Sequence, residues 1–185
     1  VEICEGQVDD IKLAENKRIP TESEYIKMIE KKTAVLFEVS CAMGAISAKK
    51  STKDVKNLSV FGRNLGIAFQ ITDDLIGIMG DSKITKKPVG NDIREGKKSL
   101  PILLAIRKAR GSDKKKILRV FGKSNATRTQ INEVVDIIRS LGIEDTVRKQ
   151  ALRYANRATN ALSKYSGIHK SDLISLLDFV VKRSV

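Results

Sequence analysis

Residues 66–79 read Gly-Ile-Ala-Phe-Gln-Ile-Thr-Asp-Asp-Leu-Ile-Gly-Ile-Met, an apolar stretch that carries two adjacent carboxylates, Asp73 and Asp74. On a helical wheel this pair shares a face with Gln70, one turn before, and with Gly77, one turn after. A buried charge without a partner is costly. We therefore expect this face to line a cavity and to meet cations there.

A lysine-rich loop with three glycines follows at residues 80–99 and offers such cations. Its basic residues are Lys83, Lys86, Lys87, Arg94, Lys97 and Lys98. Carboxylates beside lysines indicate a Mg²⁺ bridged to a polyphosphate, since Mg²⁺ prefers one or two carboxylates together with phosphate oxygens. Taken alone, the acidic pair would be a solvated helix face and the loop a mobile basic segment. Their joint occurrence in this order favours a site.

Outside this loop nearly every segment has helical spacing, and no strand pattern stands out. The expected helices cover residues 1–15, 21–49, 52–79, 100–107, 113–121, 127–141, 147–165 and 171 onward. Thr21 with Glu24 has the spacing of a capping box, which Ser51 and Asp54 repeat, and Ser171 is expected to cap the last helix. The sequence thus predicts an all-α bundle, a single domain over residues 1–185.

Two features of these helices predict how they pack. The long helix at 21–49 is expected to bury Ile26, Ile29, Leu36, Phe37 and Met43. Gly62 and Gly66 lie four residues apart on one face of the next helix. Because a glycine inside a helix costs about 1 kcal/mol, we expect a neighbouring helix to approach closely at both.

Bulk composition limits the classes of protein. With 41% hydrophobic and 31% charged residues, the chain has an ordinary globular balance. No apolar run approaches the ~20 residues of a membrane helix, and no signal peptide is visible. Cys4 and Cys41 are too few and too far apart for a zinc motif, and we expect reduced thiols in a cytoplasmic protein. The chain opens at Val1 in an apolar-polar pattern without an initiator Met, so a fragment is expected.

The formal net charge of +13 raises nucleic acid or an anionic membrane as a partner. However, the basic residues are spread along every helix, and only 4% of residues are aromatic. Such a chain offers no stacking platform for single strands and has no helix-turn-helix or zinc signature. We expect a solvated basic face and no nucleic-acid partner. A basic nucleic-acid binder stays as an alternative that retention on DNA would test.

Two further polar sets precede the acidic pair. Lys32 and Thr33 stand just before an apolar run and could contact a phosphate, although alone they would be a surface lysine and a back-bonded threonine. Gln7 and Asp10 are three residues apart on the first helix. The carboxamide of Gln70 could steady a metal, a phosphate or a reactive organic cation.

Together these residues resemble the C-terminal part of the trans-isoprenyl diphosphate synthases, the family of geranylgeranyl, farnesyl and polyprenyl diphosphate synthases. The resemblance covers nearly the whole chain, and four strings in register carry it. Gly6–Asp10 resembles the family's Gly-Gln-x-x-Asp motif, Lys32-Thr33 its Lys-Thr pair, Phe69–Asp74 the start of its second aspartate-rich motif, and Lys87–Asp92 with Gly96-Lys97 its phosphate-binding loop.

The resemblance implies a bundle of the isoprenoid synthase type around a deep apolar cavity with Mg²⁺ at its mouth, in a homodimer. The implied reaction condenses isopentenyl diphosphate with an allylic diphosphate, which ionises, alkylates its partner through the carbocation, and then loses a proton. Metal ions and lysines stabilise the departing diphosphate, and the dry cavity protects the carbocation from water.

The resemblance also implies roles for single residues. Asp73 would ligate one Mg²⁺ directly, and Asp74 would hold a metal-bound water or orient a lysine. Thr33 and Gln70 would face the developing cation. The lysines implied to contact the allylic diphosphate are Lys32, Lys87 and Lys97. The residues implied to support the site from the first helix are Gln7 and Asp10.

Two departures from the family pattern qualify this reading. The second motif usually reads Asp-Asp-x-x-Asp, and here Gly77 holds the last position. The first aspartate-rich motif, which would precede Gly6 and bind two of three metals, is absent from the sequence. We therefore expect the N-terminal helices to be missing, and the 185-residue chain to be inactive until they are supplied.

Two alternatives share the helical fold. The chain could be a non-catalytic, truncated paralogue that docks on a complete synthase and regulates it, although such a scaffold has no physical need of Lys32, Asp73, Asp74 and Lys87. It could also be a terpene cyclase or a head-to-head synthase, but the lysine-rich loop argues against that reading.

Overall fold

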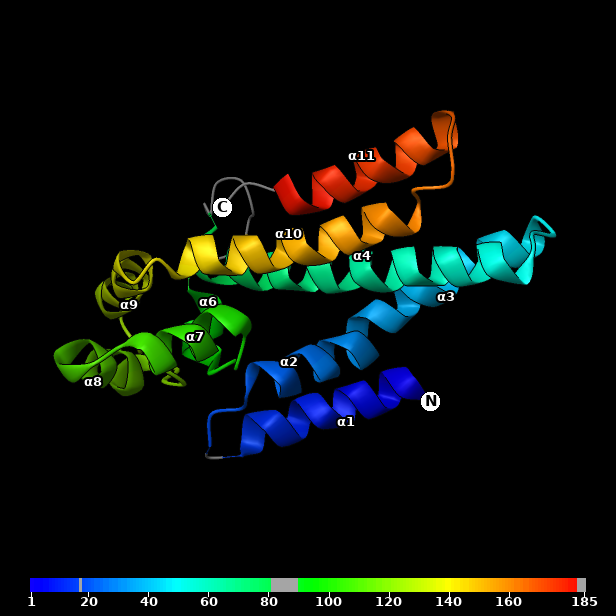
Figure 1. Ribbon diagram of the computed structural model, residues 1–185. Coiled ribbons are helices and arrows are strands. Elements are labelled where there is room, and N and C mark those ends of the chain that lie inside the picture. The colour runs from blue at the N-terminus through cyan, green and yellow to red at the C-terminus, as the bar shows by residue number, and fades with distance from the viewer. Residues whose placement is uncertain (17, 81–89, 183–185) are drawn as a thin grey trace. The chain divides into compact units, whose positions relative to one another are not determined.

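The structure is a computed structural model that describes residues 1–16, 18–80 and 90–182, and within these ranges it contains helices and turns but no strand (Figure 1). The elements are α1 (Glu2–Glu15), α2 (Glu22–Ile29), the π-helical turn η1 (Glu30–Ala34), α3 (Val35–Ser47), α4 (Thr52–Met79), α6 (Asn91–Glu95), α7 (Leu100–Lys108), α8 (Gly111–Val120), α9 (Arg128–Ser140), α10 (Ile143–Ala161) and α11 (Ile168–Lys182). The all-α prediction is confirmed.

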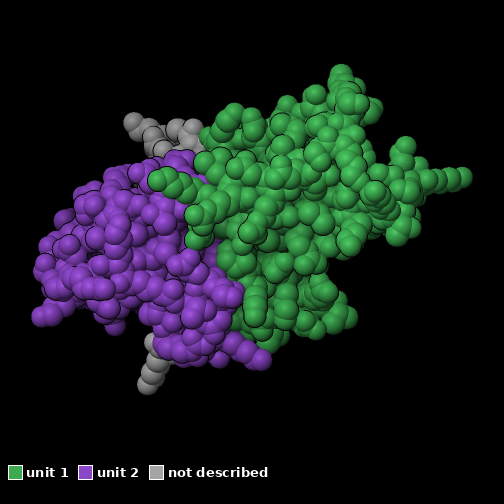
Figure 2. All heavy atoms as spheres, viewed as in Figure 1, with its two compact units in different colours: residues 1–11, 26–72, 149–183 green, residues 12–25, 73–148, 184–185 purple. Residues whose placement is uncertain are grey.

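The chain divides into two compact units, which Figure 2 distinguishes by colour. The first unit comprises residues 1–11, 26–72 and 149–183, and the second comprises residues 12–25, 73–148 and 184–185. Helices α4 and α10 each contribute residues to both units.

The predicted capping box opens α2. Glu24 N donates to Thr21 Oγ1 over 3.1 Å, and Thr21 N donates to Glu24 Oε2 over 2.7 Å. Two backbone donors that the helix leaves unpaired are thereby satisfied. At the start of α4, Asp54 N likewise donates to Ser51 Oγ over 3.2 Å.

Helices α2, η1 and α3 follow one another without a break. The π-helical turn η1 was not predicted, and because of it two residues expected in the core are exposed. In an unbroken α-helix the buried face of Met28 and Ile29 would continue to Leu36 and Met43. A π-helical turn inserts one extra residue, which rotates all later side chains by about 100°. Leu36 is therefore 58% exposed and Met43 60% exposed. The more buried side of α3 carries Phe37, Cys41 and Ala45.

The core of the first unit lies between α4, α10 and α11, which run side by side in Figure 1. Its buried residues are Phe61, Leu65, Ala155, Ala158, Leu162, Leu177 and Val180. The close approach predicted at the α4 glycines is confirmed. A Cβ on Gly62 would lie 2.5 Å from Phe37 O, and one on Gly66 would lie 2.6 Å from Ala34 Cα.

In the second unit the nearly apolar helix α7 is buried along most of its length. Helix α9 opens on the capping box of Thr127 and Gln130 and buries Ile131, Val134, Val135, Ile137 and Ile138. Gly122 and Gly142 follow the ends of α8 and α9 with φ values of 72° and 64°, a conformation that glycine adopts without strain.

The start of the last helix differs from the prediction. Gly167, with φ at 90°, turns the chain before Ile168, so α11 begins three residues ahead of Ser171. Ser171 lies inside the helix and its hydroxyl donates to Gly167 O over 3.4 Å. It is not the cap.

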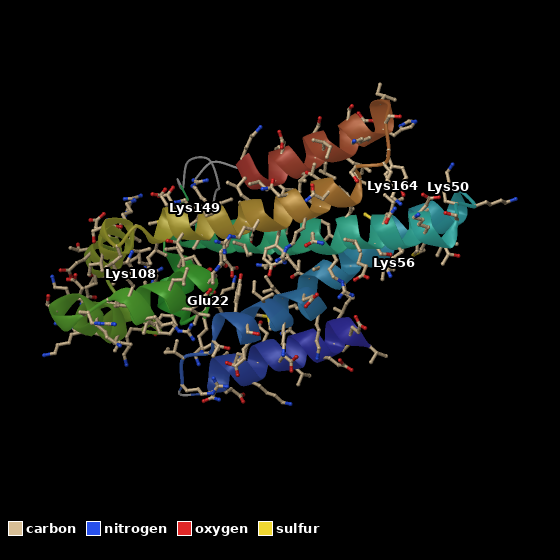
Figure 3. The ribbon with its side chains drawn as sticks, in the orientation of Figure 1. Glu22, Lys50, Lys56, Lys108, Lys149 and Lys164 are labelled. Atoms are coloured by element: carbon tan, nitrogen blue, oxygen red, sulfur yellow. The ribbon has the colours of Figure 1, made fainter. Side chains whose placement is uncertain are left out.

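Two features of the helices concern hydropathy and charge. Among the described residues, no helix combines the length and the apolar character that crossing a membrane requires. Figure 3 shows the side chains, and the lysines that it labels come from several elements and connections. They are Lys50 after α3, Lys56 on α4, Lys108 on α7, Lys149 on α10 and Lys164 after α10.

Candidate active site

The second unit gathers four polar side chains, Tyr25, Asp74, Asp92 and Lys97, which we call the Lys97 cluster. Asp74 on α4 is 1% exposed, and each of its carboxylate oxygens has its own donor. Tyr25 Oη donates to Asp74 Oδ2 over 2.7 Å. Lys97 Nζ donates to Asp74 Oδ1 over 2.9 Å. A buried carboxylate is thus held by one neutral and one charged donor.

The local backbone explains why Lys97 reaches this position. Helix α6 ends at Gly96, whose φ is 70°. Lys97 N donates to Asp92 O over 2.9 Å, and Gly96 N donates to Ile93 O over 3.3 Å, the pattern of a Schellman motif. Because this turn folds the chain back on α6, the side chains of Lys97 and Asp92 end up 3.4 Å apart, from Nζ to Oδ2.

Asp92 occupies space that Gly77 leaves open. A Cβ added to Gly77 would lie 2.8 Å from Asp92 Oδ2 and 3.0 Å from Asp92 Oδ1. Asp92 is 9% exposed. Its contact with Lys97 is longer than a typical N–H···O bond, and within the described part of the chain Oδ2 has no hydrogen-bond partner. The glycine that departs from the family pattern therefore makes room for a second buried carboxylate.

Burial and neighbouring charges shift the pKa of three side chains of the cluster. Burial, and after it the charge of Asp74, raises the pKa of Tyr25 well above its ordinary value, so the phenol remains a donor. Burial also raises the pKa of Asp92, against the charge of Lys97. Burial alone would lower the pKa of Lys97, but the charges of Asp74 and Asp92 outweigh it and raise that pKa. Lys97 therefore carries its positive charge at neutral pH.

Asp73, next to Asp74 on α4, is half-buried. Carboxylate oxygens are ligands that Mg²⁺ accepts, and both Asp73 and Asp74 have them. The oxygens of Asp74 also contact Tyr25 and Lys97. In the described ranges no three acidic, His or Cys side chains gather as a metal site.

The first unit holds a second polar cluster, where α1 packs on η1. A Cβ on Gly6 would lie 2.3 Å from Lys32 N, so only glycine lets the two backbones come this close. Asp10 follows one turn later, and Lys32 Nζ donates to Asp10 Oδ2 over 2.6 Å. In the same row Lys31 Nζ lies 3.2 Å from Asp9 Oδ2. The glycine of the Gly-Gln-x-x-Asp string thus determines where its aspartate meets the lysine.

Thr33, also in η1, faces α4. Its hydroxyl donates to Gln70 Oε1 over 2.9 Å. This bond fixes the orientation of the carboxamide and joins two residues 37 positions apart in sequence. π-Helical turns are frequent at functional sites, and η1 carries both residues of the Lys32-Thr33 pair.

The remaining predicted residues have varied positions. Gln7 is exposed on α1. Lys83, Lys86 and Lys87 lie outside the described residues. Lys98 does not face the acidic pair as the loop's cations were expected to: its Nζ donates to Leu13 O over 2.6 Å and to Asn16 O. The carbonyls at the end of a helix carry partial negative charge that attracts cations.

Two members of the Lys97 cluster were not singled out from the sequence as site residues. Tyr25 lies in a helix with an ordinary amphipathic pattern, 49 positions from Asp74, and no local signal identifies it. Asp92 was part of a quoted string, but its position over Gly77 is a tertiary contact.

Comparison with known proteins agrees with this fold. The family model described as polyprenyl synthetase matches residues 1–138. This range is well over half of the chain, and the chain belongs to that family.

Its relatives include synthases of archaea. The chain is 36% identical to the geranylgeranyl diphosphate synthase of Sulfolobus acidocaldarius, over 98% of its own length and 55% of that protein. It is 34% identical to the geranylfarnesyl diphosphate synthase of Aeropyrum pernix, over 99% and 57%. The chain thus spans a little more than half the length of these relatives.

Solved structures of synthases are also similar to this chain. The geranylgeranyl pyrophosphate synthetase of Pyrococcus horikoshii is similar with a TM-score of 0.89 and 36% identity, over 99% of this chain and 55% of that one. A polyprenyl synthase of Caulobacter crescentus, complexed with calcium and isoprenyl diphosphate, is similar with a TM-score of 0.91 and 31% identity, over 100% and 56%.

Proposed function

We propose that the chain forms the diphosphate-binding part of a Mg²⁺-dependent prenyltransferase, which condenses isopentenyl diphosphate with an allylic diphosphate. The observation that carries this proposal is the contact of Lys97 with the buried Asp74, in a chain of the polyprenyl synthetase family. The names of its relatives, a geranylgeranyl and a geranylfarnesyl diphosphate synthase, support a short-chain product.

The proposed chemistry assigns separate tasks to these residues. Asp73 would hold Mg²⁺, which when bound polarises the diphosphate and stabilises its departure. Asp74 positions Lys97, whose ammonium binds diphosphate oxygens. A fixed cation of this kind stabilises the negative charge that develops on the leaving group, because it needs no reorganisation during the reaction.

In the first unit we assign Lys32 to a diphosphate contact, with Asp10 orienting its ammonium through the 2.6 Å contact. Gln7 supports this helix face. Thr33 and Gln70 present oxygen atoms whose negative partial charge favours a developing carbocation. Lys87 would be a further diphosphate contact. Prenyl transfer would require the helices that correspond to the unmatched part of the relatives, because no Asp-Asp-x-x-Asp string occurs in this sequence.

We further infer that residues 1–185 fold as one domain, since α4 and α10 are continuous helices shared by both units. A single cooperative unfolding transition would support this, and two separate transitions would contradict it. The free thiols of Cys4 and Cys41 support a reducing, cytoplasmic location. Association as a homodimer is part of the proposal and is measured by sedimentation equilibrium.

Binding of inorganic pyrophosphate, followed by calorimetry with and without Mg²⁺, tests the proposal. We expect Mg²⁺-linked binding that is lost in Asp73→Ala and kept in Asp113→Ala, an acidic residue of α8 that the proposal does not use. Pyrophosphate binding that ignores Mg²⁺, or that survives Asp73→Ala, would contradict the assignment.

A further inference from the structure

Tyr25 belongs to the Lys97 cluster, but the proposed chemistry does not use it. Its side chain is 1% exposed, and its hydroxyl donates to Asp74 Oδ2 over 2.7 Å. A buried phenol needs a hydrogen-bond partner, but a backbone carbonyl would satisfy that need. Here the partner is the carboxylate that also holds Lys97.

The bond from Tyr25 limits how the Asp74 carboxylate can turn. The terminal torsion of an aspartate is broad and roughly two-fold, so one contact to Lys97 would not fix the carboxylate plane. A donor on each oxygen fixes both oxygens. The direction from Asp74 Oδ1 to Lys97 Nζ therefore depends on the hydroxyl of Tyr25.

Lys97 needs this support because its own side chain is flexible. A lysine ammonium moves on a four-carbon stem, and the Lys97 side chain is 40% exposed. Asp74 lies on one side of the ammonium, and Asp92, seated over Gly77, lies 3.4 Å away on another. Two carboxylates leave at least one of the three ammonium protons for an anionic ligand.

We propose that Tyr25 is a positioning residue, which acts through Asp74 to hold the Lys97 ammonium ready for a diphosphate oxygen. Asp92 completes the arrangement from the side of Gly77. The claim about the ligand rests on the proposed function, but the claim about position does not. The two are tested by different measurements.

The position of Lys97 is measured in the ligand-free chain by NMR of ¹⁵N-labelled lysine side chains. An ammonium held by carboxylates exchanges its protons with water slowly, and Lys97→Arg identifies the signal by removing it. In Tyr25→Phe we expect severalfold faster exchange at Lys97. The matched control is Tyr165→Phe. In the unaltered chain the Tyr165 hydroxyl also donates to a carboxylate, Asp54 Oδ1, over 2.7 Å.

Tyr165 is a suitable control because its partner Asp54 belongs to the first unit and lies 20 residues before Asp74, which belongs to the second. Removal of the Tyr165 hydroxyl should leave the Lys97 signal unchanged. Action through Asp74 also requires that Tyr25→Phe has no further effect in an Asp74→Asn background. Lys97 exchange that is unchanged in Tyr25→Phe, or equally altered in Tyr165→Phe, overturns the proposal.

Binding of pyrophosphate with Mg²⁺ then tests the ligand. We expect about tenfold weaker binding in Tyr25→Phe, the effect of one lost hydrogen bond to a charged group, and less than twofold change in Tyr165→Phe. If the unaltered chain binds no pyrophosphate while Tyr25→Phe still speeds exchange at Lys97, the proposed function fails and the positioning role stands. Should pyrophosphate bind equally well to Tyr25→Phe, the positioning role in binding is refuted.

Discussion

Lys97 and Lys98 are neighbours in the chain, yet their ammonium groups contact acceptors of different kinds. Lys97 Nζ lies 2.9 Å from the carboxylate of Asp74, whereas Lys98 Nζ lies 2.6 Å from the carbonyl oxygen of Leu13 at the end of α1. The ammonium of Lys97 can contact a ligand as well as Asp74. The second lysine contacts the carbonyls at a helix terminus, so the proposed function would give the first lysine a binding role and the second a structural one.

Replacing each lysine by methionine should reveal this division. In Lys97→Met the buried carboxylate of Asp74 loses its counter-ion, which we expect to cost about 2 kcal/mol, less than a fully buried pair because Lys97 is partly exposed. Pyrophosphate binding should be lost. Lys98→Met should cost about 1 kcal/mol through α1 and leave binding intact. Denaturant unfolding and calorimetry measure both, and loss of binding in Lys98→Met would contradict the division.

Gly6 should tolerate no side chain. In Gly6→Ala the new Cβ would meet the backbone of η1 at 2.3 Å, and overpacking of this kind costs about 1–3 kcal/mol. Thermal unfolding measures the change. Gly44→Ala is the matched control, since a Cβ there meets no atom within 4 Å and should stabilise α3 by about 0.5–1 kcal/mol. Similar effects at both glycines would refute the close approach.

The bond between Thr33 and Gln70 should be measurable as a coupling. Thr33→Val keeps the shape and removes the donor, with an expected cost of about 1 kcal/mol. Thr33→Ser keeps the hydroxyl and should lose less. A double-mutant cycle with Gln70→Leu isolates the pair term. A coupling energy near zero would show that this hydrogen bond does not contribute to stability.

Acid should loosen the starts of α2 and α4. The pKa of Glu24 is lowered, chiefly by its hydrogen bond from Arg18 and then by Thr21, and that of Asp54 by Ser51 and then Tyr165. A folded-state pKa below its unfolded value gives stability that is complete above the ordinary carboxyl range and is lost as pH falls through the folded value.

Hydrogen exchange at these helix starts, measured between about pH 5 and pH 2, checks this expectation. Protection should fall with pH in the unaltered chain. Glu24→Gln retains a capping-box side chain without the titration, so α2 should then show little pH dependence while α4 keeps its own. An α2 start that frays equally in Glu24→Gln would mean that another group titrates.

The helices and most of the polar strings could be predicted from the sequence because their signals are local. The Thr21 capping box, the apolar run of α7 and the glycine stops are all set by residues within a few positions of one another. The packing role of Gly62 and Gly66 followed from the cost of glycine in a helix, which had to be offset by something nearby.

Contacts between distant segments could not be predicted in this way. Tyr25 meets Asp74 across 49 residues, and Asp92 fills the space over Gly77 because α6 returns toward α4. The use of Lys98 as a helix cap depends on where α1 ends in space. The predicted buried face of α3 was wrong for another reason. A π-helical turn has no signature in the amino-acid composition, yet it rotates every side chain that follows it.

The extra residue in η1 also limits which insertions and deletions this chain can accept. Deleting one residue between Glu30 and Ala34 would restore an unbroken α-helix and turn α3 back by about 100°. The exposed apolar side chains of Leu36 and Met43 would then move to the side of Met28 and Ile29, and the glycine contacts of α4 would face different partners. A change of length inside this five-residue segment would therefore alter which face of α3 is buried.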